Sequence, residues 1–158
     1  MLERFEMLTL GTSQIYKDIQ KIKKARMNSL GLKGTHAMCI YYLHQNPEGL
    51  TATELCSLCR EDKAGISRIL ADLERHHFIE YDQSGTGKKY RTKAVLTEEG
   101  NEYASKVTDL ILHATLMGGK GLSDEDREVF YRVLFQIANN LDKLCEELEQ
   151  QQKGYDYE

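Results

Sequence analysis

The stretch DKAGISRILADLERHH, residues 62–77, predicts an amphipathic helix that decides the fold. Asp62 is of the residue type that caps a helix N-terminus. Four apolar side chains recur at i, i+3, i+4 and i+7, which aligns them in one stripe along a helix; they are Ile66, Ile69, Leu70 and Leu73. We expect this stripe to lie in the core. The opposite side, which should stay open, carries small and basic residues: Ala64, Ser67, Arg68, Ala71 and Arg75.

A shorter helix is predicted immediately before this one. Thr51 and Glu54 have the spacing of a capping box, in which each side chain bonds the backbone amide of the other residue. Leu50 and Leu55 stand where a hydrophobic staple places its two apolar residues. This helix should end near Cys59, which leaves only a tight link before the next helix. The arrangement predicts a helix-turn-helix.

A β-hairpin is predicted directly after the second of these helices. Its strands are residues 78–81 and 90–97, and the polar loop over residues 82–89 joins them. A hairpin in this position is the wing of a winged helix-turn-helix. Basic side chains gather near its tip, namely Lys88, Lys89 and Arg91.

Longer helices are predicted on both sides of this centre. Residues 5–28 and 35–44 precede it, and helices beginning at Thr97 and Ser123 follow it. Residues 150–158 are expected to fray. The fold class is therefore mainly α with a small β-hairpin wing, in one domain. The last helix carries a heptad-like apolar seam: Phe130, Leu134, Ile137, Leu141, Leu144 and Leu148.

Composition indicates a soluble globular chain, with 41% hydrophobic and 29% charged residues among 158. The N-terminus lacks the pattern of a signal peptide, and no apolar stretch is long enough to span a membrane, so we expect a cytoplasmic protein. The net charge is −4, but its distribution is uneven. Residues 17–33 carry six Lys or Arg against one Asp, whereas residues 123–158 carry ten Asp or Glu against four Lys or Arg. An acidic tail can coexist with a basic face that attracts a polyanion.

The open face of the 62–77 helix suits the major groove of duplex DNA, which admits one α-helix. Ala64 allows a close approach, and Ser67 can donate or accept a hydrogen bond. Arg68 can reach guanine O6 and N7 with two hydrogen bonds, although an ion pair with Asp72 is the alternative. Lys63 and Arg75 lie toward the two ends of the helix and are expected to contact phosphates. The wing residues Lys88, Lys89 and Arg91 are expected to contact a neighbouring minor groove.

These segments together resemble the MarR family of winged helix-turn-helix transcriptional regulators. Residues 62–74 are similar to the family's recognition helix, and residues 78–79 and 95–100 to the start and exit of its wing. The resemblance covers residues 32–100 by motif. It implies a homodimer built from helices within residues 1–30 and 101–150, which leaves residues 151–158 as the tail expected from the sequence. It also implies a pseudo-palindromic operator, usually repression, and release by a small ligand or an oxidant. The family's wing often carries an Asp-Arg pair near its tip, which Lys88 and Lys89 replace here.

Three further residues, His36, Tyr42 and His113, are candidates for an effector cleft, with a structural role as the alternative. Cys56 and Cys59 form a Cys-x-x-Cys, but no second pair lies at zinc-ribbon spacing, so we expect no metal and no cofactor. Cys39 and Cys145 are expected to be reduced thiols in the core or at an interface. Redox sensing by any of the four cysteines stays open, because reactivity depends on a thiol's pKa.

Two other function classes remain as alternatives. A winged helix can serve as a protein-interaction module without direct operator binding, with the heptad helix recruiting a partner. An enzyme is not expected, because the sequence has no nucleophile–base spacing, metal quartet or nucleotide loop. The segment Gly85-x-Gly87-Lys88 departs from a phosphate-binding loop, since position 82 is Asp and Lys89 stands where Ser or Thr is required.

Overall fold

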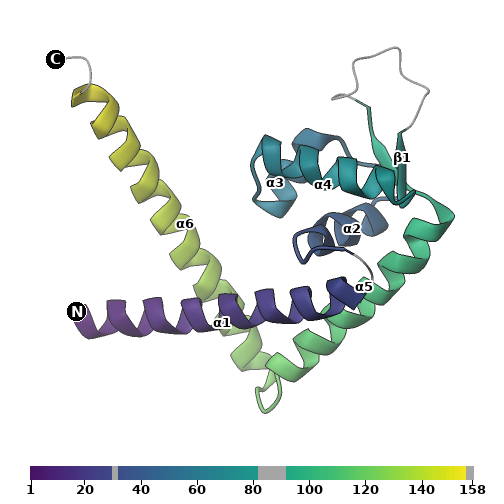
Figure 1. The fold of residues 1–158 in the computed structure, drawn as a ribbon. Helices are drawn as coiled ribbons and strands as arrows, with labels where there is room; N and C mark the ends of the chain where they lie inside the picture. Colours follow the sequence, from purple (N-terminus) through teal and green to yellow (C-terminus); the bar gives the residue numbers. More distant parts are fainter. Residues whose placement is uncertain (30–31, 82–91, 156–158) are drawn as a thin grey trace. The chain divides into compact units, whose positions relative to one another are not determined.

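The computed structural model describes residues 1–29, 32–81 and 92–155, and it follows the predicted order of elements (Figure 1). Contacts between residues divide the chain into two compact units, residues 1–114 and residues 115–158. Within the described residues, no helix is long and apolar enough to cross a membrane. The elements are α1 (Leu2–Ser29), α2 (His36–Gln45), α3 (Ala52–Cys59), α4 (Lys63–Arg75), β1 (Ile79–Tyr81), β2 (Ala94–Leu96), α5 (Glu98–Gly118) and α6 (Asp124–Tyr155).

The helix-turn-helix is formed by α3 and α4 as the sequence predicts. Thr51 and Glu54 make the capping box at the start of α3, with the Glu54 amide 3.3 Å from Thr51 Oγ1 and the Thr51 amide 2.7 Å from Glu54 Oε2. Arg60 ends α3 in the left-handed region at φ 55°. This residue reverses the chain within a very short link, so that α4 can begin at once.

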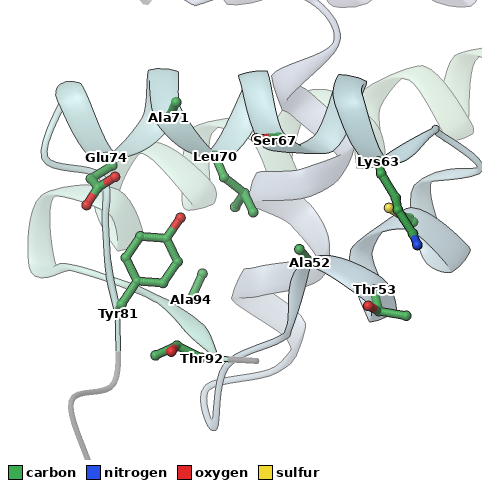
Figure 2. A pocket seen from close by; sticks show the side chains of 11 residues that line it. Ala52, Thr53, Lys63, Ser67, Leu70, Ala71, Glu74, Tyr81, Thr92 and Ala94 are labelled. Atoms are coloured by element: carbon green, nitrogen blue, oxygen red, sulfur yellow. The ribbon is translucent and has the colours of Figure 1, made fainter. Parts of the chain in front are cut away.

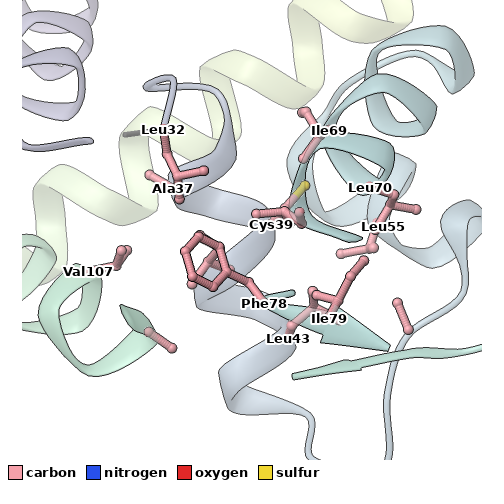
Figure 3. Close-up of a cluster of buried hydrophobic side chains, with 14 of the residues drawn as sticks. Leu32, Ala37, Cys39, Leu43, Leu55, Ile69, Leu70, Phe78, Ile79 and Val107 are labelled. Atoms are coloured by element: carbon pink, nitrogen blue, oxygen red, sulfur yellow. The ribbon is translucent and has the colours of Figure 1, made fainter. Parts of the chain in front are cut away.

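The core of the first unit lies between α2, α3, α4 and the hairpin (Figure 3). The predicted stripe of α4 is buried there, with Ile66 and Leu73 fully inaccessible and Ile69 and Leu70 each 5% exposed. Leu50 and Leu55, the predicted staple, are buried as well. Burying an aliphatic side chain stabilises a fold by about 1.5–3 kcal/mol, so this stripe fixes which face of α4 points outward.

The wing is an antiparallel pair in which Ile79 lies opposite Leu96 and Tyr81 opposite Ala94. Ala94 also bridges to Leu50, which ties β2 to the entry of α3. The predicted second strand, residues 90–97, is longer than the three residues found, since Thr92 and Lys93 lie outside the ladder and Thr97 caps α5. Ala94 therefore pairs on one side with Leu50 and on the other with Tyr81.

The start of α5 packs closely against the end of the α4–β1 connection. Thr97 Oγ1 accepts a hydrogen bond from the Gly100 amide at 3.0 Å and donates one to the His77 carbonyl at 2.7 Å. A Cβ added at Gly100 would lie 1.9 Å from the carbonyl oxygen of Phe78. The junction therefore requires glycine at this position for close approach rather than for an unusual backbone angle.

The second unit contains the end of α5, a short loop and α6. Ser123 and Asp126 cap α6 reciprocally, with the Asp126 amide 3.1 Å from Ser123 Oγ. Arg127 donates to the Gly119 carbonyl at 2.9 Å, which holds the loop against the first turns of α6. The prediction of a frayed tail from residue 150 was wrong for residues 150–155, because α6 continues to Tyr155.

Candidate nucleic-acid interface

The N-terminus of α4 is fixed by Asp62, whose Oδ1 accepts a hydrogen bond from the Gly65 amide at 2.6 Å. With the apolar stripe buried, the opposite face of α4 is open to solvent. All five residues predicted on α4 to contact DNA are exposed, which confirms their accessibility but leaves their DNA contacts predictions. They are Lys63, Ala64, Ser67, Arg68 and Arg75.

Arg68 lies on the exposed face and donates from Nε to the Ala64 carbonyl at 3.1 Å, one turn back along α4. The alternative of an ion pair with Asp72 is not what the structure shows. Asp72 instead lies within ion-pair distance of Lys33, His36 and Arg75. The terminal guanidinium nitrogens of Arg68 are therefore available to a ligand on this face.

Asp72 links α4 to the segment that leads into α2. Its Oδ2 atom is 3.4 Å from Lys33 Nζ and 3.3 Å from His36 Nε2, and its Oδ1 atom accepts from Arg75. Burial alone would raise the pKa of Asp72, but the hydrogen bond and charge of Lys33, with Arg75 and His36, hold it below its ordinary value. The carboxylate thus stays ionised. Arg75, predicted to contact phosphate, is in part neutralised by it.

An open groove of about 510 Å³ runs along one flank of the exposed face (Figure 2). It separates α4 from the N-terminus of α3 and the base of the wing, and the side chain of Tyr81 reaches from β1 toward α4. Lys63 and Ser67 line it from α4, and Thr53 and Thr92 from the other walls. The lining of the groove is mainly apolar, and these four side chains add three hydroxyls and one ammonium group to it.

The wing tip carries the remaining predicted DNA contacts. Lys88, Lys89 and Arg91 lie outside the described residues, so their placement stays a prediction. In the described part of the wing, Lys93 is exposed beside β2. The pKa of the Glu54 carboxyl is lowered mainly by its hydrogen bonds with Thr51, and the charge of Lys93 lowers it slightly further.

The three residues predicted for an effector cleft do not line the groove beside α4. His36 is buried at 2% exposure, and its Nδ1 lies 3.1 Å from the Lys33 carbonyl. Tyr42 is half-buried with its ring edge-on to Tyr41, while His113 is exposed on α5. Burial lowers the pKa of His36, although the Lys33 carbonyl and Asp72 oppose this. Its surroundings are those of a structural histidine.

The cysteines show one relationship that sequence spacing does not predict. Cys39 Sγ of α2 lies 3.4 Å from Cys59 Sγ of α3, so Cys59 pairs with a cysteine of the preceding helix rather than with Cys56 of its own helix. Cys145 is exposed on α6. Within the described ranges, no group of three or more His, Cys, Asp or Glu side chains is arranged to hold a metal ion.

Comparison with known proteins gives the same architecture. Residues 30–89 match the sequence model of the MarR family. A putative MarR family transcriptional regulator from Listeria monocytogenes, complexed with a 26mer DNA, has a TM-score of 0.76 and 17% identity, over 84% of this chain and 87% of that one. A MarR protein from Peptoclostridium difficile has a TM-score of 0.76 and 15% identity, covering 87% and 88%.

A MarR family regulator from Neisseria meningitidis has a TM-score of 0.71 and 19% identity, covering 90% of this chain and 97% of that one. At these identities the structural likeness concerns the fold, whereas the family match comes from the sequence of the helix-turn-helix and the start of its wing. A search among curated proteins found no match.

Proposed function

We propose that this chain, a winged-helix protein of the MarR type, represses transcription by binding a pseudo-palindromic operator as a homodimer. The single observation that carries the proposal is the orientation of α4. Its apolar stripe is buried and its basic and small residues face outward, which is the arrangement a helix needs to enter a major groove.

The residues on the exposed face of α4 are proposed to make two kinds of contact, with bases and with phosphates. Arg68 has terminal donors not engaged by Asp72 and reads guanine, while Ala64 keeps the backbone close to the bases. Ser67 contacts bases or phosphates from the groove side. Lys63 and Arg75 bind phosphates, and Lys88, Lys89 and Arg91 extend the interface from the wing.

Dimerisation is supported by apolar side chains that the single chain leaves open on α1 and α6. On α6 the heptad positions Phe130, Leu141, Leu144 and Leu148 are 45–54% exposed. On α1, Ile15, Ile19 and Ile22 are 41–52% exposed. Seams of this regularity are typical of helix–helix association, and we propose that a second copy covers them. Two copies then present their α4 helices to major grooves about one helical turn apart.

Control by a small-molecule effector belongs to the proposal because the family resemblance implies it. An effector acts only if it binds the DNA-competent and DNA-incompetent states with different affinities. His36, Tyr42 and His113 remain the residues predicted for this role. Because His36 is buried, its part would be to transmit a change between α2 and Asp72 on α4.

The direct test is selection of bound duplexes from a random pool by the full-length protein. We expect enrichment of an inverted repeat whose half-sites lie about 10 base pairs apart. Binding should weaken steeply with salt, because counterions are released from the phosphates. Recovery of no preferred sequence at low salt, together with capture of a protein partner, would favour the interaction-module alternative. A sequence without two-fold symmetry would contradict the dimeric arrangement.

A further inference from the structure

Cys39 of α2 and Cys59 of α3 form a thiol pair where the helix-turn-helix packs on the helix before it. Their sulfur atoms lie 3.4 Å apart and share a hydrogen bond, although twenty positions separate the residues in sequence. A disulfide requires the two sulfurs to approach to about 2.05 Å, which is a small further movement from this distance. The two helices that carry them pack directly on each other, so the pair is held in place by the core rather than by a loop.

The two thiols differ in access. Cys39 is completely buried, whereas Cys59 is half-buried at the last residue of α3. Cys59 also lines an open cleft of about 240 Å³ within the first unit. A small solute can therefore reach Cys59 but not Cys39. The other side chains lining this cleft come from α1, α2 and the α3–α4 link: Tyr16, Gln20, Lys23, Thr35, Met38, Arg60 and Glu61.

The surroundings of the pair favour a thiolate at Cys59. The hydrogen bond from Cys39 lowers the pKa of Cys59 most; burial and the Glu61 carboxylate oppose it, and the Lys23 ammonium adds to the lowering. The same hydrogen bond and deeper burial raise the pKa of Cys39. A thiolate is the nucleophilic form of cysteine, so these contacts assign attack to Cys59 and leave Cys39 as the protonated neighbour.

We propose that Cys59 and Cys39 are a hydroperoxide-reactive pair in which Cys59 is the attacking thiol and Cys39 the resolving one. The Cys59 thiolate attacks the outer oxygen of a hydroperoxide, an S–O bond forms, the O–O bond breaks, and the released alkoxide or hydroxide takes up a proton. Cys39 sulfur then attacks Cys59 sulfur, the S–S bond forms, and the hydroxyl leaves as water with the Cys39 proton. Two thiols are oxidised and one peroxide is reduced.

Access, proximity and order of reaction together distinguish this pair from the other two cysteines. Cys56 lies one turn before Cys59 on the same helix, but it lines the groove beside α4 rather than the cleft that holds Cys59, and the thiol contact of Cys39 is made with Cys59. Cys145 is exposed on α6, in the other unit. If exposure alone decided reactivity, Cys145 would be oxidised first. The proposal predicts instead that Cys59 is oxidised before Cys145.

The test uses the reduced full-length protein and hydrogen peroxide in slight excess. We expect loss of two hydrogen atoms per chain, and proteolytic mapping should find a Cys39–Cys59 disulfide that a thiol reductant reverses. Cys39→Ser should stop the reaction at a Cys59 sulfenic acid, which dimedone traps. Cys59→Ser should leave Cys39 unreacted. Cys56→Ser and Cys145→Ser are the matched controls and should form the Cys39–Cys59 disulfide at the wild-type rate.

Either of two results would overturn the proposal. One is a wild-type protein whose oxidation products lie at Cys145 or in a Cys56–Cys59 disulfide while Cys39 stays reduced. The other is equal peroxide reactivity of Cys59 and a denatured-state thiol in a competition experiment. Because Cys39 is buried, Cys39→Ala serves as a second variant if the serine destabilises the fold, and far-ultraviolet circular dichroism checks both. None of these readouts depends on DNA binding.

Discussion

His36 Nε2 of α2 lies 3.3 Å from Asp72 Oδ2 of α4, so a buried imidazole faces the carboxylate that also holds Lys33 and Arg75. The ring is 2% exposed and its pKa is lowered, chiefly by burial. The contact joins the helix that precedes the helix-turn-helix to the helix proposed to enter the major groove. Its protonation state therefore bears on how firmly α4 is held.

The first prediction concerns pH. Because the folded pKa of His36 lies below its ordinary value of 6.5, the unfolded chain binds this proton more readily. The stability that His36 contributes is present above that value and is lost as the pH falls through it toward the folded pKa. We expect the Tm of the wild type to decline more steeply between about pH 7 and about pH 5 than that of His36→Gln. A His36 ring resonance that titrates above 6.5 would contradict this.

The second prediction concerns base reading by Arg68. Arg68→Ala should weaken operator binding by about 1–3 kcal/mol and relax the preference at one position of each half-site. Arg68→Lys keeps the charge but loses the two-pronged donor geometry, so most affinity should remain while the base preference weakens. Binding to matched and singly altered operators measures both effects. Arg132→Ala on α6 is the charge-matched control. Equal discrimination by wild type and Arg68→Lys would remove Arg68 from its proposed role.

The third prediction concerns the close packing at Gly100. A methyl group at this position would overlap the Phe78 carbonyl, which is backbone and cannot rotate away. Gly100→Ala should therefore destabilise the protein by about 1–3 kcal/mol, as overpacking of a core does. Gly118→Ala at the far end of the same helix meets nothing within 4 Å and should be neutral or slightly stabilising. Urea unfolding at one fixed protein concentration compares them, and similar midpoints for the two variants would disprove the packing argument.

The fourth prediction concerns the dimer seam of α6. Leu141→Asp would place one unpaired carboxylate from each copy in the proposed interface, at a cost of about 3–5 kcal/mol. The dimer Kd should rise by about a hundredfold or more. Asn139→Asp adds the same charge on the opposite side of the helix and should leave the Kd unchanged. Sedimentation equilibrium measures both. A Leu141→Asp protein that stays dimeric to the same dilution as Asn139→Asp would exclude this seam from the interface.

The features predicted correctly from sequence are those that depend on neighbouring residues. The Thr51–Glu54 box, the Asp62 cap and the buried face of α4 each follow from side chains within a few positions of one another. The residues that form each feature lie within one or two turns of helix, so their positions relative to one another do not depend on contacts with distant segments. The outward face of α4 follows from the same pattern, because burying one side of a helix exposes the other.

The features that sequence did not reveal depend on contacts between distant segments. Cys39 reaches Cys59, and His36 reaches Asp72, only after α2, α3 and α4 have packed. Periodicity cannot show which of the two cysteines on α3 faces α2, so the Cys-x-x-Cys spacing drew attention to Cys56 and Cys59 as a pair and not to Cys39. The end of α6 was missed for a different reason. Its last turns are polar, which local composition reads as a tail, although the helix continues to Tyr155.

The junction of β2 and α5 has a mechanical consequence. Thr97 ties its hydroxyl to the carbonyl of His77, and Gly100 fits against Phe78 without room for a methyl group. These contacts join the base of the wing and the first turn of α5 into one rigid piece. A rotation of α5 therefore also moves the connection between α4 and β1, so α5 acts as a lever on α4. In the proposed dimer, a tilt imposed farther along α5 would therefore be passed to the face of α4 proposed to contact DNA, and the angle of α5 would set the spacing between the two α4 helices.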